Sequence, residues 1–456
     1  MLAFRQRSRR SLALGLRDTY GLNALHRLQL KIGCENIDAL TDLYAVLKGN
    51  DSLQDFAAEV AAELVSEYDK ILRILVVEAP EPVVRIQFPR WTFFSMETEL
   101  QRLGIDCSAR FRFQSFEQLR RLAVGFRFPT GQIILKYGYR ATAEEIILVS
   151  LTRLSFPCRW EDMYERFPGR KSQALQVMFY FFLNFMVKNW AYLLLNNMTF
   201  WLPYLPTSCE AIRLKLANLG NVDWRLDIPQ GVFQYCGFID NTMIPFCRPG
   251  GVMDEGPQGD RVPEELQEAW YSGWKKLHGM KWETVILANG MDLHVFGPES
   301  VRHNDLFMLD HSGIEQKMRD LQAGRLFFYR VFGDSAYVNS DVLGSGGGRG
   351  MASVRETVEW SYKDLKVLWK YCDYRHVLKV RKQPVAKIIF VCMLLRNAHV
   401  TMCGAQGGEY LDMLPPTFED WVSQGPSAHP IPISSIFHPD FVHDENDNES
   451  SDEEEA

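Results

Sequence analysis

Three acidic residues, widely separated along the chain, have the side-chain type and the positions needed to bind a divalent metal. Asp240 and Asp334 each end an apolar run that predicts a buried strand, and Glu359 lies in a stretch with helical spacing. Strand ends meet at the edge of a sheet, and a helix packed across the sheet can bring a third carboxylate beside them. Because converging carboxylates repel one another, this arrangement predicts a cation between them, and Mg²⁺ takes carboxylate and phosphate oxygens as ligands.

A pair of such ions would favour phosphodiester chemistry. Two metals about 3.5–4 Å apart can activate an attacking oxygen and stabilise a leaving oxygen. The chain contains 57 acidic residues, so accidental triples are numerous and the three acids alone do not decide the matter.

The sequence around these acids resembles that of the PIF/Harbinger group of DDE transposases and their domesticated nuclease relatives. The resemblance covers residues 233–372, with a looser match to a helix-turn-helix near 142–195. The matching blocks, in chain order, are GFIDNTMIPFCRP, YSGWKKLHGMKWETVILANG, GPESVRHND, FGDSAY and RETVEWSYKDLKVLW.

The resemblance implies that Asp240, Asp334 and Glu359 are the catalytic, metal-binding acids and that the cofactor is Mg²⁺ or Mn²⁺. Glu359 is preferred to Glu356 because the family's Glu follows an aliphatic or β-branched residue. In the family's scheme the enzyme cuts the ends of a DNA element, and the freed 3′-hydroxyl then attacks target DNA.

Further site residues follow from the same blocks. His303 and Asp305 match a His-Asp block near the family's active site and are secondary candidates, although a lone His is more often a structural hydrogen bonder. Arg355 lies one helical turn before Glu359 and could pair with that acid or with phosphate, or form an ordinary surface ion pair. The candidate DNA-binding residues are Arg170, Lys171, Lys275, Lys276, Lys281, Arg355 and Lys366.

Several positions depart from the family pattern. Asn241 and Ala336 stand where Gly is usual, Trp360 and Lys363 stand where Arg and Gly are common, and an insertion occupies 248–265. None of these changes removes an acid, but together they leave open whether this copy is active.

The predicted fold class is α/β, with an RNase H-like mixed sheet flanked by helices, preceded by a mainly helical, helix-turn-helix-like domain. Residues 353–371 predict a long helix, and the apolar run 177–187 predicts a buried helix because it is too short to cross a bilayer. The predicted domains are a 1–110 N-terminal region of unknown role, a 111–200 helical DNA-binding domain, a 201–232 linker, a 233–410 catalytic domain and a 411–456 extension with a disordered acidic tail.

The helix-turn-helix prediction depends on a short helix, a Pro-Gly break and a long helix that begins near Arg170 and Lys171. Basic residues at that point suit contact with DNA. The alternative is an ordinary helical hairpin, which the strongly apolar second helix favours.

Charge and composition limit the function classes. The 456 residues are 46% hydrophobic, which excludes a wholly disordered chain, a coiled-coil rod and a collagen-like polymer. The net charge is −7, yet eight acids lie within 444–455, so the remaining body is near neutral. The nine cysteines form no CxxC pair, which favours a reducing, intracellular compartment over a disulfide framework.

The leading functional prediction is therefore a metal-dependent DNA transposase or endonuclease. The alternatives are a host-adopted or inactive DNA-binding or interaction factor and a nuclease that acts outside transposition. The expected partners are DNA (element ends and target), a Myb-like companion protein and further copies of the chain, with no membrane. The resemblance implies a nuclear site of action.

Overall fold

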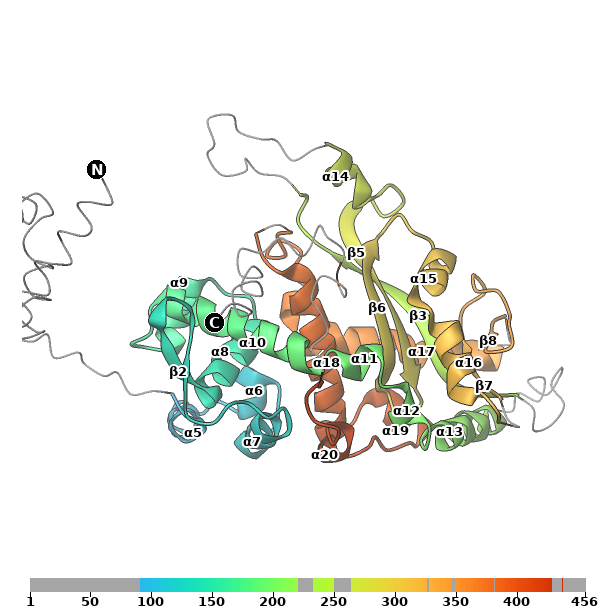
Figure 1. Cartoon of the computed structure of the whole chain (residues 1–456), viewed down its shortest axis with the longest axis horizontal. Helices are drawn as coiled ribbons and strands as arrows, with labels where there is room; N and C mark the ends of the chain where they lie inside the picture. Colours follow the sequence, from blue (N-terminus) through green and yellow to red (C-terminus); the bar gives the residue numbers. More distant parts are fainter. Residues whose placement is uncertain are drawn as a thin grey trace, which may run out of the picture. The chain divides into compact units, whose positions relative to one another are not determined.

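The computed structural model describes residues 91–219, 233–249, 264–325, 328–346, 349–380, 382–428 and 437. The chain divides into two compact units, residues 1–86 and 87–456. The first unit lies outside the described residues, as does the acidic tail from 438 onward. The described part of the second unit is drawn in colour in Figure 1.

The second unit begins with short helices and a small hairpin. Side-chain caps explain several helix starts: Thr92, Ser115 and Thr142 each accept a hydrogen bond from the backbone three residues on. The elements are α5 (Phe93–Leu103), α6 (Cys107–Phe111), α7 (Phe116–Gly125), β1 (Gln132–Ile134), β2 (Arg140–Thr142), α8 (Ala143–Ser155) and α9 (Trp160–Arg166).

Two long apolar helices form the core between this helical part and the sheet. The first, α10 (Ser172–Trp190), contains the apolar run 177–187 and buries Phe182 and Met186, as the sequence predicts. The second, α18 (Val385–Cys403), is long and apolar enough to cross a membrane, but 83% of its most apolar window is buried inside the protein. The two helices contact each other (Figure 1), so α18 serves as a core helix.

The segment after α10 is helical up to residue 218. It forms α11 (Tyr192–Leu195), α12 (Met198–Trp201) and α13 (Leu205–Asn218). Ser208 of α13 donates to the carbonyl of Cys236 (2.6 Å) and accepts from the backbone N–H of Ala288 (2.9 Å). The first part of the expected 201–232 linker is therefore packed against the sheet, and residues 220–232 lie outside the described residues.

A mixed sheet lies at the centre of the predicted catalytic region. Its strands run in the order β6–β5–β3–β7–β8, and β4 pairs with the beginning of β5. β3 is antiparallel to β5 and parallel to β7. The strands are β3 (Phe233–Pro245), β4 (Tyr271–Ser272), β5 (Leu277–Leu287), β6 (Asp292–Ser300), β7 (Phe328–Phe332) and β8 (Leu343–Gly344).

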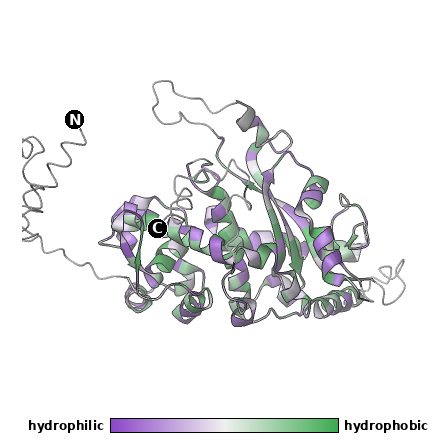
Figure 2. Ribbon diagram, in the orientation of Figure 1, coloured by the Kyte–Doolittle hydropathy of each residue, from purple (hydrophilic) through white to green (hydrophobic). Residues whose placement is uncertain are grey.

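Helices cover both faces of this sheet. On one face, α13 and α17 (Arg349–Leu368) share an apolar cluster with β3 and β5 that includes Ile212, Phe238, Ile286 and Val358. The opposite face contacts α15 (Asp305–Ser312) and α16 (Ile314–Gln322). Figure 2 shows hydrophobic residues running along the central strands between these layers. The observed architecture is thus mixed α/β with a mixed sheet flanked by helices.

The C-terminal segment returns to the first helices. After α19 (Gln406–Leu411), the short α20 (Phe418–Trp421) packs Phe418 against Phe126, with ring centroids 5.2 Å apart. Glu419 accepts from Arg121 at 2.7 Å. Phe418 and Trp421 are buried, so the first part of the predicted 411–456 extension packs into the core of the second unit.

The close approach of β3 and β5 gives a test of the fold. A Cβ added to Gly237 would lie 2.2 Å from the backbone oxygen of Ile286, so Gly237→Ala must push the two strands apart. We expect a loss of about 1–3 kcal/mol in the free energy of unfolding, measured by urea denaturation. Gly273→Ala, where a Cβ meets nothing within 4 Å, is the matched control and should leave stability unchanged. Equal midpoints for the two variants would contradict the observed strand register.

Candidate active site

Asp240 lies within β3, opposite Thr284 of β5. The sequence predicted that the strand ends at Asp240, and this is wrong: pairing continues to Pro245, opposite Gly279. The antiparallel partner extends beyond the last apolar residue before Asp240, so the backbone stays in the sheet although the side-chain pattern becomes polar. The Asp240 side chain is 20% exposed.

Asp334 follows β7, and the parallel register places it beside Asp240. Phe238 of β3 pairs with Phe332 of β7, and each aspartate comes two residues after its paired phenylalanine. Two residues along a strand return a side chain to the same face, which explains why the two acids face the same region. Asp334 is half-buried, and its Oδ1 accepts from the backbone N–H of Ala336 (2.9 Å).

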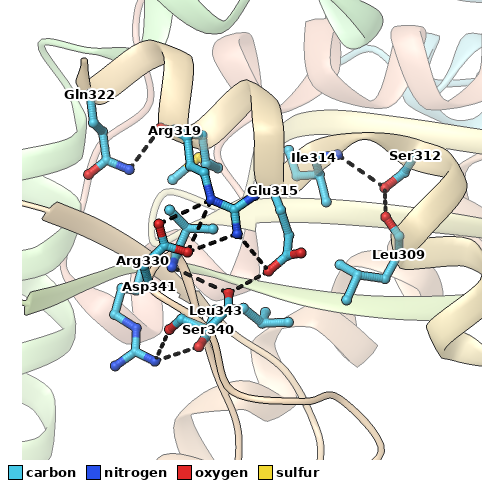
Figure 3. Close-up of polar contacts among 12 residues, drawn as sticks. Leu309, Ser312, Ile314, Glu315, Arg319, Gln322, Arg330, Ser340, Asp341 and Leu343 are labelled. Atoms are coloured by element: carbon cyan, nitrogen blue, oxygen red, sulfur yellow. Dashed lines mark hydrogen bonds and ion pairs between the residues drawn. The ribbon is translucent and has the colours of Figure 1, made fainter.

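The loop after Asp334 is fixed by a polar network, shown in Figure 3. From α16, Arg319 binds the Asp341 carboxylate (2.8 Å), and Glu315 accepts from the Ser340 hydroxyl. From β7, the Arg330 guanidinium donates to the carbonyl of Ser340 (2.6 Å). These contacts connect α16 and β7 to the loop, and they hold the chain that carries Asp334 at the end of β7.

α17 brings the third acid over the same face. Val354 and Val358 point into the apolar cluster with the sheet. One turn further, the buried Tyr362 hydroxyl donates to the backbone carbonyl of Asp240 (2.7 Å) and lies 2.7 Å from the Thr284 hydroxyl. This contact fixes the helix register, and Glu359, three residues before Tyr362, lies at the mouth of the site with its side chain 57% exposed.

Arg355 bridges two of the three acids. Its Nη1 lies 3.6 Å from Asp240 Oδ2, and its Nη2 lies 3.3 Å from Glu359 Oε1. Glu356, the alternative acid on this helix, is exposed and is not among the residues that line the cavity. The expected i,i+4 pair of Arg355 with Glu359 is present, and the same guanidinium also reaches Asp240.

The electrostatics of Asp240 show that the acids influence one another. The pKa of Asp240 is raised to about 6, chiefly by burial and to a smaller extent by the negative charges of Asp334 and Glu359. A backbone hydrogen bond at Asn241 and the charge of Arg355 act in the opposite direction. A carboxyl that is buried beside two other acids needs a positive charge nearby in order to ionise.

A cavity of about 500 Å³ opens beside these residues. Asp240 and Glu359 form one side of it, and lysines in and after the end of α17 form the other, where Lys370 pairs with Asp373 (3.6 Å). The lining residues are Asp240, Asn241, Glu359, Tyr362, Lys363, Lys366, Val367, Lys370 and Asp373. Carboxylates and ammonium groups therefore share one space, which suits a ligand that brings both a cation and a polyanion.

The donor set fits a hard divalent cation by its chemistry. Asp240, Asp334 and Glu359 supply only oxygen ligands, as Mg²⁺ and Mn²⁺ prefer. Burial is the main cause of the raised pKa of Asp240, and a cation would offset both the burial and the smaller repulsion from Asp334 and Glu359. Among the described residues, no three His, Cys, Asp or Glu side chains are already close enough to enclose an ion. The acids thus face one region without enclosing an ion, and Arg355 lies between Asp240 and Glu359.

A second polar group lies beyond Asn241. Asn241 donates to the Asp305 carboxylate (3.0 Å) and to the Tyr337 hydroxyl (2.7 Å), and Lys281 pairs with Asp305 at 2.6 Å. Asp305, a secondary candidate, is therefore joined to the residue next to Asp240. His303 instead lies 3.2 Å from Glu299 and is not among the residues that line the cavity.

Sequence reasoning missed Glu283 in this second group. Glu283 pairs with Asn241 across β3 and β5 and is fully buried, and neither of its carboxylate oxygens has a hydrogen-bond partner. Ser312 lies nearby, but its hydroxyl donates to the carbonyl of Leu309 (3.0 Å). The sequence did contain a signal for Glu283, which is an acid inside the otherwise apolar run WETVIL. Such an acid lies either on an exposed face of its strand or in a buried position, where it needs an explanation.

The predicted DNA-binding residues are found in several places. Arg170 is engaged by the buried Glu145, with Nε 2.7 Å from Oε1, whereas Lys171 is exposed. Lys275 and Lys276 are exposed at a hairpin tip. Lys366 lines the cavity.

The helical hairpin α9–α10 is present as predicted. Its second helix is mostly buried, however, and only Gln173 and Lys188 are exposed along α10. Little of that helix is free to enter a DNA groove, and the recognition role of the hairpin stays a prediction.

Comparison with known families supports an endonuclease class for this part of the chain. Residues 240–397 match the model of a family described as DDE superfamily endonuclease. The matched segment begins at Asp240 and includes Asp334 and Glu359. It indicates a transposase- or endonuclease-type function on DNA, in a superfamily that typically uses divalent metals. The chain matches no curated protein and no solved structure.

Glu283 gives a pH-dependent prediction. The pKa of Glu283 is raised from 4.5 to about 7, chiefly by burial; Asp305 contributes to the rise, and Lys281 and Lys317 oppose it. Between pH 4.5 and about pH 7, Glu283 holds a proton in the folded chain that it has lost in the unfolded chain. The free energy of unfolding therefore falls as the pH rises through this range. We expect Glu283→Gln to match the wild type at pH 4.5 and to exceed it by about 3 kcal/mol at pH 8, since each pKa unit is worth about 1.4 kcal/mol.

Chemical denaturation at several pH values measures this difference. Glu356→Gln, at an exposed position, is the control and should show no such trend. A stability difference for Glu283→Gln that does not change with pH would contradict the assignment of a buried neutral carboxyl.

Proposed function

We propose that this protein is a DDE-type DNA nuclease that cuts and joins phosphodiester bonds as a transposase of the PIF/Harbinger group. The observation that carries the proposal is the shared cavity, in which Asp240 and Glu359 line the same space as Lys363, Lys366 and Lys370. A phosphodiester backbone with bound divalent ions matches both kinds of side chain. The family match over residues 240–397 supports the nuclease class.

In this proposal Asp240, Asp334 and Glu359 would hold Mg²⁺ or Mn²⁺, which supplies charge stabilisation for in-line phosphoryl transfer. Tyr362 keeps α17 in register with β3 through the carbonyl of Asp240. Arg355 neutralises part of the charge on Asp240 and Glu359.

The lysines of α17 would bind the DNA backbone. Lys363 and Lys366 are three residues apart and therefore lie on one face of the helix, and Lys370 extends the row beyond the end of α17. From Lys363 to Lys366 the rise along the helix is about 4.5 Å, which is somewhat more than one nucleotide step of a DNA strand at about 3.4 Å. Lys363, a departure from the family pattern, thus adds a cation at the cavity.

The finer parts of the proposal rest on the sequence blocks. The mixed sheet flanked by helices is compatible with an RNase H-like fold. For DNA recognition at α9–α10, the exposed Lys171 at the turn is a better contact than the buried length of α10. The near-neutral charge of the body supports a basic, Myb-like companion protein. We also propose a nuclear location and an oligomer that joins two DNA ends.

A plasmid assay tests the function. We expect wild-type protein with Mg²⁺ or Mn²⁺ to excise a segment flanked by the matching terminal repeats. Asp240→Ala, Asp334→Ala and Glu359→Ala should each lower the rate by about 1,000-fold or more, because each removes a ligand of the metal ions that would stabilise the transition state by several kcal/mol. Glu356→Ala, on the same helix outside the cavity, is the matched control and should keep the wild-type rate.

Other outcomes separate the alternatives. Nicking without excision would favour a nuclease outside transposition. DNA binding that survives loss of all three acids, with no cleavage by the wild type, would favour an adopted DNA-binding factor. Full activity of the Asp240→Ala variant would refute the site.

A further inference from the structure

The hairpin between β4 and β5 exposes an aromatic ring beside two lysines. Tyr271 and Ser272 pair with His278 and Leu277, which leaves residues 273–276 as the turn. Trp274 is 89% exposed, and Lys275 and Lys276 are exposed beside it. Across the described ranges, Trp274 is the sole exposed tryptophan, and the others are buried or half-buried. A tryptophan normally buries its ring, so its display here calls for an explanation.

The turn has a defined conformation. The Ser272 hydroxyl accepts from the backbone N–H of Lys275 (3.2 Å), and Lys276 adopts a left-handed backbone with φ of 52°. At the base, Gly279 donates to the carbonyl of Trp270 (3.1 Å), and the buried Trp270 packs against Phe246. The ring of Trp274 is therefore presented from an anchored hairpin, which lowers the entropy lost on binding a partner.

The chemistry of this turn, residues 273–276 (the tip), favours nucleic acid as the binding partner. From residue 270 to residue 282 the chain has no acid and three lysines. Lys275 and Lys276 are exposed at the turn, whereas Lys281 pairs with Asp305. Tyr271 and His278, whose rings lie 5.0 Å apart, add flat surface at the base of the tip. Aromatic rings stack on bases, and lysines bind phosphates. A protein partner would more commonly require a larger apolar patch than one ring among cations.

The tip is also within reach of DNA bound at the carboxylates. β5 connects the two places, because Thr284, opposite Asp240, lies ten residues along the chain from Trp274. Ten extended residues span at most about 35 Å, which is about one turn of a DNA duplex. One bound DNA molecule could therefore contact the cavity and the tip together.

We propose that this tip is a second DNA contact, in which Trp274 stacks on an unstacked base and Lys275 and Lys276 bind the flanking phosphates. The inference rests on the proposed nuclease function and adds to it a preference for locally unpaired or distorted DNA. Stacking of this kind is tolerant of sequence, so the tip contributes affinity for DNA shape rather than base recognition.

Binding measurements on the full chain test the proposal. Fluorescence anisotropy with Ca²⁺, which replaces the catalytic ion, compares a fully paired 40-base-pair DNA with the same DNA carrying a short unpaired bubble. We expect Trp274→Ala to weaken bubble binding by about 10-fold or more and paired-duplex binding by less than about 2-fold, and Trp274→Phe to restore most of the loss. Lys275→Ala with Lys276→Ala should weaken both and reduce the salt slope by about 2.

Tyr137→Ala is the matched control. Tyr137 is a 67% exposed aromatic with the Lys136 ammonium 5.6 Å from its ring, but it lies on the separate β1–β2 hairpin. This variant should bind both DNAs as the wild type does.

The outcomes separate this inference from the function on which it rests. Wild-type nicking with unchanged bubble affinity for Trp274→Ala would overturn the tip contact alone. Unchanged DNA binding together with lost self-association in sedimentation would assign the tip to a protein contact and overturn it as well. A wild-type chain that neither binds nor nicks DNA would overturn the proposed function and this inference together.

Discussion

The pairing of β3 with both of its neighbours is the constraint on which the candidate site depends. Parallel pairing with β7 places Asp334 beside Asp240, because each aspartate follows a paired phenylalanine by two residues. Antiparallel pairing with β5 sets Thr284 opposite Asp240, and Thr284 and the backbone of Asp240 together receive the Tyr362 hydroxyl of α17. One strand register thus places Asp334 beside Asp240 and sets the position of α17, the helix that carries Glu359, over the same face of the sheet.

Charge compensation is the second physical theme. A buried carboxyl beside two other acids is costly unless a cation is near. Arg355 supplies part of that compensation from within the chain, and the lysines at the end of α17 extend positive charge along the cavity. A divalent ion and a phosphodiester would complete the same balance. The structure therefore combines acids that need cations with cations that suit phosphate, which is the combination that nuclease chemistry requires.

Elements governed by local patterns were well predicted from the sequence. The helices α7, α8 and α10 follow their apolar patterns, α7 and α8 also begin at capping residues, and the strands of the sheet follow their apolar runs. Features that depend on partners far away in the chain were not predicted. Asp240 stays within the strand because β5 continues beside it, and Arg170 is engaged by Glu145 from another helix. Glu283 was missed because the sequence does not show which face of its strand is covered.

The binding of Mn²⁺ to the full chain, followed by electron paramagnetic resonance, tests the central claim most directly: that Asp240, Asp334 and Glu359 form one cation site. The account predicts that Asp240→Asn, Asp334→Asn and Glu359→Gln each weaken Mn²⁺ binding by about 10-fold or more, whereas Glu356→Gln binds as the wild type does. Wild-type affinity in all three variants, or an equal loss in Glu356→Gln, would contradict it.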